Sequence, residues 1–414
     1  MTHDPPEVPR TSLSGGQRHD RPLRHNVVAL GAVSFLTDVS SEMTLTLLPL
    51  FLSDALGVRT MVIGLIEGLA ELTATLLKFV SGWLSDRLGR RKLLTFLGYG
   101  LSAFSKPLLY FAGTWESVLG IRVADRVGKG IRTAPRDALV ADSADRGKHG
   151  RAFGLHRALD TAGAVWGTGI AALVVYFSQR GAVTMSRPTY QNLVLLGVVP
   201  AALALGVLVL FVREIRPQGK ARSLLLSLAG YDRQFYFFLA SVVLFTLGNS
   251  SDAFLVLRAR NVGLSTLQAA LMVFAFNVVY SLLAMPLAAL SDRIGRRRVI
   301  FVGWAVYALI YLGFGLVRAT WQVPLLYVLY GVYYAAFEGT SKALVADVVP
   351  DSARRGTAYG LYQVAVGITA LPASFLAGVL WQYVAPSAPF YFGSLMVLAA
   401  AVLLWAGVRP RQEG

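Results

Sequence analysis

Cysteine is absent from this chain, and charged residues are scarce. With no Cys among the 414 residues, disulfide bonds and thiolate metal sites are excluded. Charged residues make up 15% of the sequence, hydrophobic residues make up 55%, and the mean hydropathy is +0.55. A soluble protein of this length has too little polar surface to cover so many apolar side chains. The composition therefore predicts an integral membrane protein embedded in the lipid bilayer.

Motifs for nucleotide binding and catalysis are also missing. The sequence contains no Gly-x-x-x-x-Gly-Lys-Ser/Thr loop, so ATP is not the expected energy source. No group of residues has the spacing of a dedicated metal site, although paired carboxylates can bind a hard cation. We therefore expect that the protein is not an enzyme and that it holds neither a cofactor nor a resident metal.

Apolar stretches of about 20 residues recur along the chain, and this is the length that crosses the hydrocarbon core of a bilayer. They predict an all-α membrane protein with twelve transmembrane helices, of which the fourth is the most heavily charged. The expected spans are residues 27–52, 60–84, 93–113, 117–140, 154–177, 192–212, 234–257, 265–290, 299–317, 321–345, 357–381 and 388–408.

A basic segment at the midpoint, interrupted by Pro217 and Gly219, divides these spans into two groups of six. Proline and glycine interrupt regular structure, so this segment is expected to be a linker. The polar N-terminus is expected to be disordered. The predicted organisation is a cytoplasmic tail at 1–25, six-helix bundles at 26–212 and 234–408, a cytoplasmic linker at 213–233 and a cytoplasmic tail at 409–414.

The placement of the basic residues predicts the orientation. The net charge is +16, and with twelve spans both termini lie on one side of the membrane. The loops on that side carry most of the Lys and Arg residues, which identifies it as the cytoplasmic side. A bacterial-type inner membrane is the expected location. Because topology accounts for the basic excess, no nucleic-acid partner is expected. The expected partners are a small-molecule solute, protons and the lipid bilayer, and the protein is expected to be a monomer.

One loop sequence occurs twice. Ser-Asp-Arg-x-Gly-Arg-Arg stands at 85–91 and again at 291–297, close to half the chain length apart. Two further similarities follow in the same order, between 137–142 and 342–347 and between 151–156 and 357–362. Repeats at this spacing are typical of membrane transporters built from two homologous halves. The halves are therefore expected to form two pseudo-symmetric six-helix bundles.

The six-plus-six arrangement, the basic linker and the loop Gly-x-Leu-x-Asp-Arg-x-Gly-Arg-Arg-Lys at 82–92 resemble the major facilitator superfamily over about residues 26–408. The resemblance implies a transporter in which this loop latches the two halves together when the protein is open to the outside. The alternative is a solvated loop that only sets orientation. The predicted cytoplasmic latch residues are Gly82, Asp86, Arg87, Gly89, Arg90, Arg91, Asp292, Arg293, Gly295 and Arg296.

Charged residues inside the expected spans are the main functional signal, because each costs about 2.5–3.5 kcal/mol at mid-bilayer. Five basic residues of the fourth span, at spacings of 4, 3, 3 and 4, fall within roughly 120° of the helix surface. This basic stripe must face carboxylates or a cavity. Asp38 with Glu42, and Glu67 with Glu71, form i,i+4 pairs that each present one face.

These charges have two interpretations: an ion-pair network that holds helices together, or a site for substrate and protons. Desolvation offsets most of the Coulombic gain of a purely structural network, which favours the second interpretation. The candidate proton-coupling and substrate residues are Asp38, Glu42, Glu67, Glu71, Arg122, Arg126, Lys129, Arg132, Arg136, His156, Arg157, Asp160 and Asp252.

The segment 126–130 resembles the Arg-x-x-Gln-Gly motif of proton-coupled members of the superfamily, with lysine at position 129 in place of glutamine. The resemblance implies that Arg126 tunes the protonation of a nearby carboxylate, for which Asp38 or Glu42 is expected. The prediction is thus a proton-coupled secondary transporter of a small solute, with an anion or zwitterion favoured by the basic stripe. A partial exporter motif around Gly163 favours efflux by antiport.

Two alternatives stay open. The acidic pairs are compatible with export of a cationic drug or a metal ion. A different class is a membrane sensor or assembly protein that retains the fold but moves no solute.

Overall fold

The computed structural model describes residues 20–144, 149–179, 181–215, 230–294, 296–349 and 352–408. Within these ranges, the side chains of 20–24, 86, 149–150, 285, 288–296, 337–343, 346–347 and 352–356 are not described. The described part of the chain is helical and contains no strand.

The first half, residues 20–215, contains six long helical segments, two of which continue into a short irregular turn. Pro49 follows the first long segment, and Pro107 stands where the third long segment tightens into a 3-10 turn. Both positions are expected of a residue that cannot continue the α-helical hydrogen bonding. The elements are α1 (Asp20–Leu45), α2 (Leu48–Leu50) with the π turn Phe51–Ala55, α3 (Thr60–Leu88), α4 (Arg91–Ser105) with the 3-10 turn Lys106–Tyr110, α5 (Trp115–Asp142), α6 (His149–Gln179) and α7 (Arg187–Phe211).

The second half, residues 230–408, repeats this pattern, but its first span is broken into two helices. The elements are α8 (Arg233–Gly248), α9 (Ala253–Val262), α10 (Thr266–Ile294), α11 (Arg296–Leu316), α12 (Gln322–Val348), α13 (Ser352–Tyr383) and α14 (Ala388–Gly407). The twelve predicted spans correspond to these twelve helical segments. Within the described residues, nine helices are long and apolar enough to cross a membrane as they stand.

One boundary differs from the predicted organisation, and most of the predicted tails and linker lie outside the described residues. Helix α1 begins at Asp20, so residues 20–25, expected to be disordered, are helical. Pro22 stands in its first turn, where proline leaves no hydrogen bond unmade. Residues 1–19, 216–229 and 409–414, which carry most of the predicted tails and linker, lie outside the described residues.

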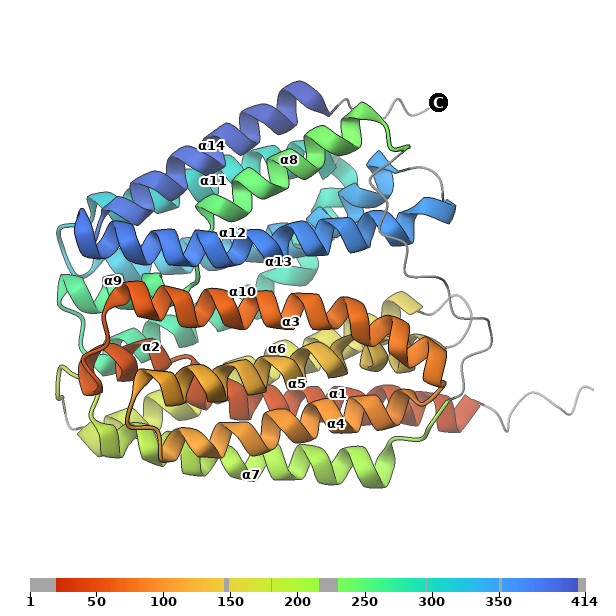
Figure 1. Ribbon diagram of the computed structural model, residues 1–414, viewed down its shortest axis with the longest axis horizontal. Coiled ribbons are helices and arrows are strands. Elements are labelled where there is room, and N and C mark those ends of the chain that lie inside the picture. The colour runs from red at the N-terminus through yellow and green to blue at the C-terminus, as the bar shows by residue number, and fades with distance from the viewer. Residues whose placement is uncertain are drawn as a thin grey trace, which may run out of the picture.

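The helices of each half pack with one another. Two pairs of long helices join the halves, and the short helix α2 also contacts α9 across them. Helix α3 packs along α13, and α6 packs along α10. Figure 1 shows that α1 begins and α14 ends at the same end of the molecule. This end is called the terminal face below. The end that carries α2 and α9 is called the opposite face.

The two halves approach most closely toward the opposite face. A Cβ atom added to Gly378 of α13 would lie 2.6 Å from the Cα atom of Met61 in α3, and one added to Gly68 would lie 2.9 Å from the Cα atom of Leu371. Larger residues at these positions would push the helices apart. The glycines therefore let the backbones of the two halves touch on this side of the membrane centre.

Candidate functional site

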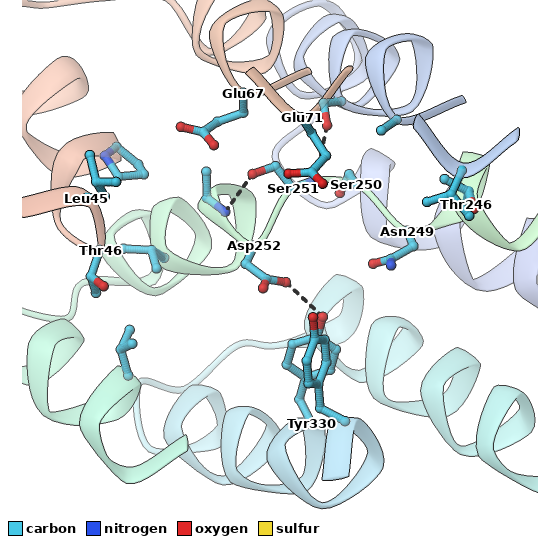
Figure 2. Close-up of a pocket in the computed structure, with 18 of the residues that line it drawn as sticks. Leu45, Thr46, Glu67, Glu71, Thr246, Asn249, Ser250, Ser251, Asp252 and Tyr330 are labelled. Atoms are coloured by element: carbon cyan, nitrogen blue, oxygen red, sulfur yellow. Dashed lines mark hydrogen bonds between the residues drawn. The ribbon is translucent and has the colours of Figure 1, made fainter. Parts of the chain in front are cut away.

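A cavity of about 650 Å³ lies between the two halves. Its walls differ in chemistry: the first half contributes most of the charges, and the second half contributes amide, hydroxyl and aromatic groups. Figure 2 shows Glu67 and Glu71 of α3 facing the α8–α9 connection, with Tyr330 of α12 beyond it. The charged residues that line the cavity are Glu42, Glu67, Glu71, Lys78, Arg122, Arg126, Lys129 and Asp252.

The break between α8 and α9 places polar groups of residues 249–252 in this cavity. Asn249 accepts a hydrogen bond from the Tyr307 hydroxyl at 2.9 Å, and Asp252 accepts one from the Tyr330 hydroxyl at 2.8 Å. Non-helical backbone at this depth is tolerated where it is enclosed by protein or lines a water-filled cavity. The break was not predicted, although the polar run after Gly248 within an apolar stretch was a signal for it.

The basic stripe of α5 divides between two environments. Arg122, Arg126 and Lys129 line the cavity. Nearer the terminal face, the Arg132 guanidinium lies 4.4 Å from the centre of the Tyr99 ring. Arg136 donates to Asp137 at 2.8 Å and to the Ser34 hydroxyl at 3.2 Å.

The cavity end of the stripe contains both paired and unpaired cations. Arg122 donates to the two carboxylate oxygens of Glu67 at 2.9 and 3.3 Å, and it also lies 3.6 Å from Asp125. Arg126 lies 3.9 Å from Asp125, and its Nε atom has no hydrogen-bond partner. Among the described residues, no hydrogen bond or ion pair of the Lys129 ammonium group is found, while its carbonyl accepts from the Thr133 hydroxyl at 2.6 Å. Asp125 was not among the predicted site residues, although its i,i+3 spacing from Arg122 is visible in the sequence.

Four other predicted residues form a separate polar cluster beside the cavity. The carboxyl groups of Asp38 in α1 and Asp160 in α6 lie next to each other, and a hydrogen bond between them needs a proton on one of the two because ionised carboxylates only accept. Asp160 accepts from Arg157 at 3.2 Å, and Arg157 donates to the Tyr280 hydroxyl of α10. His156 lies 3.0 Å from the Ser34 hydroxyl.

This carboxyl pair is therefore connected to the interface between the halves. Arg157 belongs to the first half and Tyr280 to the second, and the guanidinium also lies 5.7 Å from the centre of the Tyr280 ring. Tyr280 in turn contacts Tyr334, an aromatic residue of the cavity wall, at a ring distance of 5.5 Å.

In the first predicted latch loop, the described interactions stay within the first half. Gly89 adopts φ of 62° and ends α3, which explains the glycine of the motif. Arg91 pairs with Asp142 at the end of α5, and Arg87 lies over the Trp83 ring. Arg90 is exposed, and Gly82 faces Ala134 of α5. The side chains of Asp86, Asp292, Arg293 and Arg296, and Gly295 as a whole, lie outside the described residues, so a latch between the halves stays a prediction.

At the opposite face, Asp54 connects three segments. Its Oδ2 atom accepts hydrogen bonds from the Met185 amide at 2.9 Å and from Arg260 Nε at 3.2 Å. Thr266 also donates to the Val183 carbonyl, through its amide at 3.1 Å and its hydroxyl at 3.0 Å. These contacts join the first half to the second at the opposite face, beyond the end of the cavity. Sequence reasoning missed Asp54, whose only signal was a carboxylate at the edge of an apolar span.

Known proteins resemble the chain over nearly its whole length. The model of the Major Facilitator Superfamily matches residues 30–257 and 223–414. An uncharacterised MFS-type transporter of Methanocaldococcus jannaschii is 33% identical over 404 residues, covering 96% of this chain and 98% of the relative.

Solved structures show the same fold at low sequence identity. A POT family transporter in complex with 5-aminolevulinic acid superposes with a TM-score of 0.77 at 14% identity, over 95% of this chain and 97% of the other. A D-xylose-proton symporter gives a TM-score of 0.73 at 16% identity, over 94% and 98% of the two chains.

Proposed function

The chain belongs to the major facilitator superfamily of transporters, and we propose that it is a secondary active transporter that couples a small solute to protons by alternating access. The observation that carries the proposal is the charged cavity between the halves, which is closed at the opposite face by contacts across them. A site enclosed by two bundles can be exposed to either side if the bundles rock about it.

The proposed orientation places the terminal face in the cytoplasm of a cell with a bacterial-type inner membrane. Exposed Arg87, Arg90 and Arg213 lie at this face, consistent with the excess of basic residues expected in cytoplasmic loops. In this orientation the contacts of Asp54 close the external side of the cavity.

The proposed proton site is the pair Asp38 and Asp160. The expectation from sequence was that Asp38 or Glu42 lies near Arg126. Glu42 interacts electrostatically with Arg126, whereas Asp38 lies beside Asp160. One proton shared by two carboxyl groups leaves one negative charge for Arg157. Release of that proton adds a second negative charge to the pair, which strengthens its attraction for Arg157. Protonation is thereby linked to the contact of Arg157 with Tyr280 in the second half.

The proposed solute is an anion or a zwitterion. Arg122 of the cavity is hydrogen-bonded to Glu67, whereas Arg126 lies 3.9 Å from Asp125 with its Nε atom unbonded, and Lys129 also faces the cavity. Guanidinium and ammonium groups bind carboxylates and phosphates. Glu42 accepts from the Thr46 hydroxyl at 2.5 Å and Asp252 from the Tyr330 hydroxyl, so two carboxylates are available for a positive group. This arrangement favours a zwitterion over a metal ion.

Efflux by antiport, expected from the partial exporter motif, stays a prediction. Gly163 and Gly167, which suggested an exporter motif, face the backbone of α1 at Phe35 and Val39. Close helix packing accounts for both glycines, so they give no argument for efflux by antiport.

The test is flux into proteoliposomes that contain a pH-sensitive dye. Single amino acids, dicarboxylates, aromatic acids and nucleosides are added outside under an imposed pH gradient. We expect at least one to move protons with it, and Arg126→Gln to lower that flux at least tenfold. Solute movement unaffected by a protonophore would contradict the coupling. Binding without any flux would favour the sensor or assembly alternative.

A further inference from the structure

A second hollow adjoins the central cavity within the second half. It has a volume of about 140 Å³ and lies between α8, α11 and α13. Its boundary with the central cavity consists of residues that line both spaces. These shared residues are Phe245, Thr246, Asn249, Tyr362 and Val366.

The inner wall of this side pocket is apolar and buried. Phe238, Ile300 and Trp304 are each 1% exposed, and Val242 is 4% exposed. Phe245 stacks on Trp304 with ring centres 4.8 Å apart, and Phe238 stacks on Tyr362 at 6.0 Å. Aromatic stacking on both sides gives the pocket defined walls.

The size and lining of the pocket indicate the group that it accommodates. Protein interiors are close-packed, and voids larger than a water molecule are few. An apolar cavity of about 150 Å³ stays dry and takes up one benzene molecule. The lining offers few polar groups to a water: the side chains of Thr246 and Asn249, the Tyr362 hydroxyl and the Trp304 indole N–H. A six-membered carbon ring fits both its volume and its chemistry.

The charged groups of the central cavity define the rest of the ligand. Arg126 and Lys129 border the 650 Å³ space that the side pocket adjoins, and a space of this size holds a drug-sized molecule. Resting on the proposed transport function, we propose that the solute is an organic anion with a ring-sized apolar group. The ring occupies the side pocket, and the anionic group binds Arg126 and Lys129.

The alternative is that the hollow only gives the helices room to move. Thermal unfolding of the purified full-length protein in an alkyl-chain detergent separates the two, because a ligand that binds the folded state raises its stability. The probes are phenylacetate, acetate and phenethylamine. We expect phenylacetate to raise the unfolding temperature, acetate to raise it much less, and phenethylamine not to reproduce the effect. Equal shifts with acetate and phenylacetate would overturn the proposal.

Val242→Phe fills the side pocket and should weaken the apparent affinity for phenylacetate about tenfold or more, which corresponds to about 1.4 kcal/mol. Val243→Phe, the neighbouring residue of α8, lines neither space and is the matched control. An undiminished response of Val242→Phe would contradict the side pocket as the binding site. If Val242→Phe does not fold, photolabelling of the wild type with 4-azidophenylacetate decides: label in 238–249, 300–304 or 362–366 supports the proposal, and label elsewhere overturns it.

The binding measurement needs no gradient and no transport. If phenylacetate binds as expected but no solute crosses the membrane, the proposed function fails and the ligand class stands. If a solute without a ring is transported and phenylacetate has no effect, the ligand class fails and the proposed function stands.

Discussion

Arg260 Nε lies 3.2 Å from Asp54 Oδ2, and this ion pair joins α9 of the second half to the end of the first span. The Asp54 side chain is 8% exposed and also accepts a hydrogen bond from the Met185 amide. A carboxylate buried this far is stable only with its partners in place. Opening the opposite face would therefore break several contacts of one residue together, which makes Asp54 a gate between the two proposed states.

Asp54→Asn should shift the protein toward the state that is open at the opposite face. The substitution removes the ionic component of the contact with Arg260, and a change of about 1.4 kcal/mol alters the ratio of the two states tenfold. Because the natural chain has no Cys, a single Ser251→Cys reports access to the cavity. We expect its labelling by a membrane-impermeant maleimide, added at the opposite face, to become about tenfold faster.

The control for this experiment is Glu116→Gln, which removes an exposed carboxylate from the start of α5. Its labelling rate should equal that of the Ser251→Cys parent. If Asp54→Asn also leaves the rate unchanged, Asp54 is not a gate.

The neighbouring carboxyl groups of Asp38 and Asp160 are predicted to hold one bound proton between them. Two carboxyl groups in hydrogen-bonding contact hold one proton between them, since two adjacent negative charges repel. The infrared spectrum of the wild type should contain the carbonyl band of a protonated carboxyl group, and Asp38→Asn and Asp160→Asn should each remove it. Asp232→Asn, at an exposed position before α8, should retain it. A band that persists in both pair variants would show that the proton lies elsewhere.

Much of this architecture was predictable because hydrophobic length and repeat spacing are local properties of the sequence. The twelve helical segments follow from apolar runs, and the turn at Gly89 follows from its place in the loop motif. The stripe of α5 was expected to avoid lipid, and side-chain exposures of 5% for Arg122 and 13% for Arg126 agree with that expectation.

What sequence could not provide was the choice of partner across helices. Asp38 and Glu42 lie one turn apart on α1, yet Asp38 pairs with Asp160 of α6 while Glu42 faces the cavity. Periodicity gives the face of a helix but not which neighbour covers each turn. The Asp54 gate depends on a contact between residues 206 positions apart, which no local pattern encodes.

Arg122 and Glu67 are predicted to act mainly in stability, in contrast to Arg126. Their side chains are 5% and 13% exposed, and removing one member of a buried ion pair costs about 3–5 kcal/mol because the other charge is left uncompensated. Asp125 remains near Arg122 at 3.6 Å. The loss of folding free energy in Glu67→Gln should therefore fall at the low end of this range. Thermal unfolding should show a lower midpoint for Glu67→Gln and partial recovery in Glu67→Gln/Arg122→Gln.

The matched variant is Arg126→Gln, which removes a cation whose Nε atom has no hydrogen-bond partner. It should retain the wild-type midpoint while losing solute flux. Additive destabilisation in the Glu67 and Arg122 double-mutant cycle would show that the two side chains do not interact.

The loop at 82–92 offers a test that separates local stability from the predicted latch. Arg91 is held by Asp142 at the end of α5, so Arg91→Gln should destabilise the first half by about 1 kcal/mol, as expected for a partly exposed pair. Arg90 is exposed in this state, and Arg90→Gln should leave the unfolding midpoint unchanged. If Arg90 contributes to a latch in the state open at the opposite face, Arg90→Gln should instead slow maleimide labelling of Ser251→Cys from that face, because it removes a contact made only there. If Arg90→Gln leaves the labelling rate unchanged, the loop acts only in setting the orientation of the protein in the membrane.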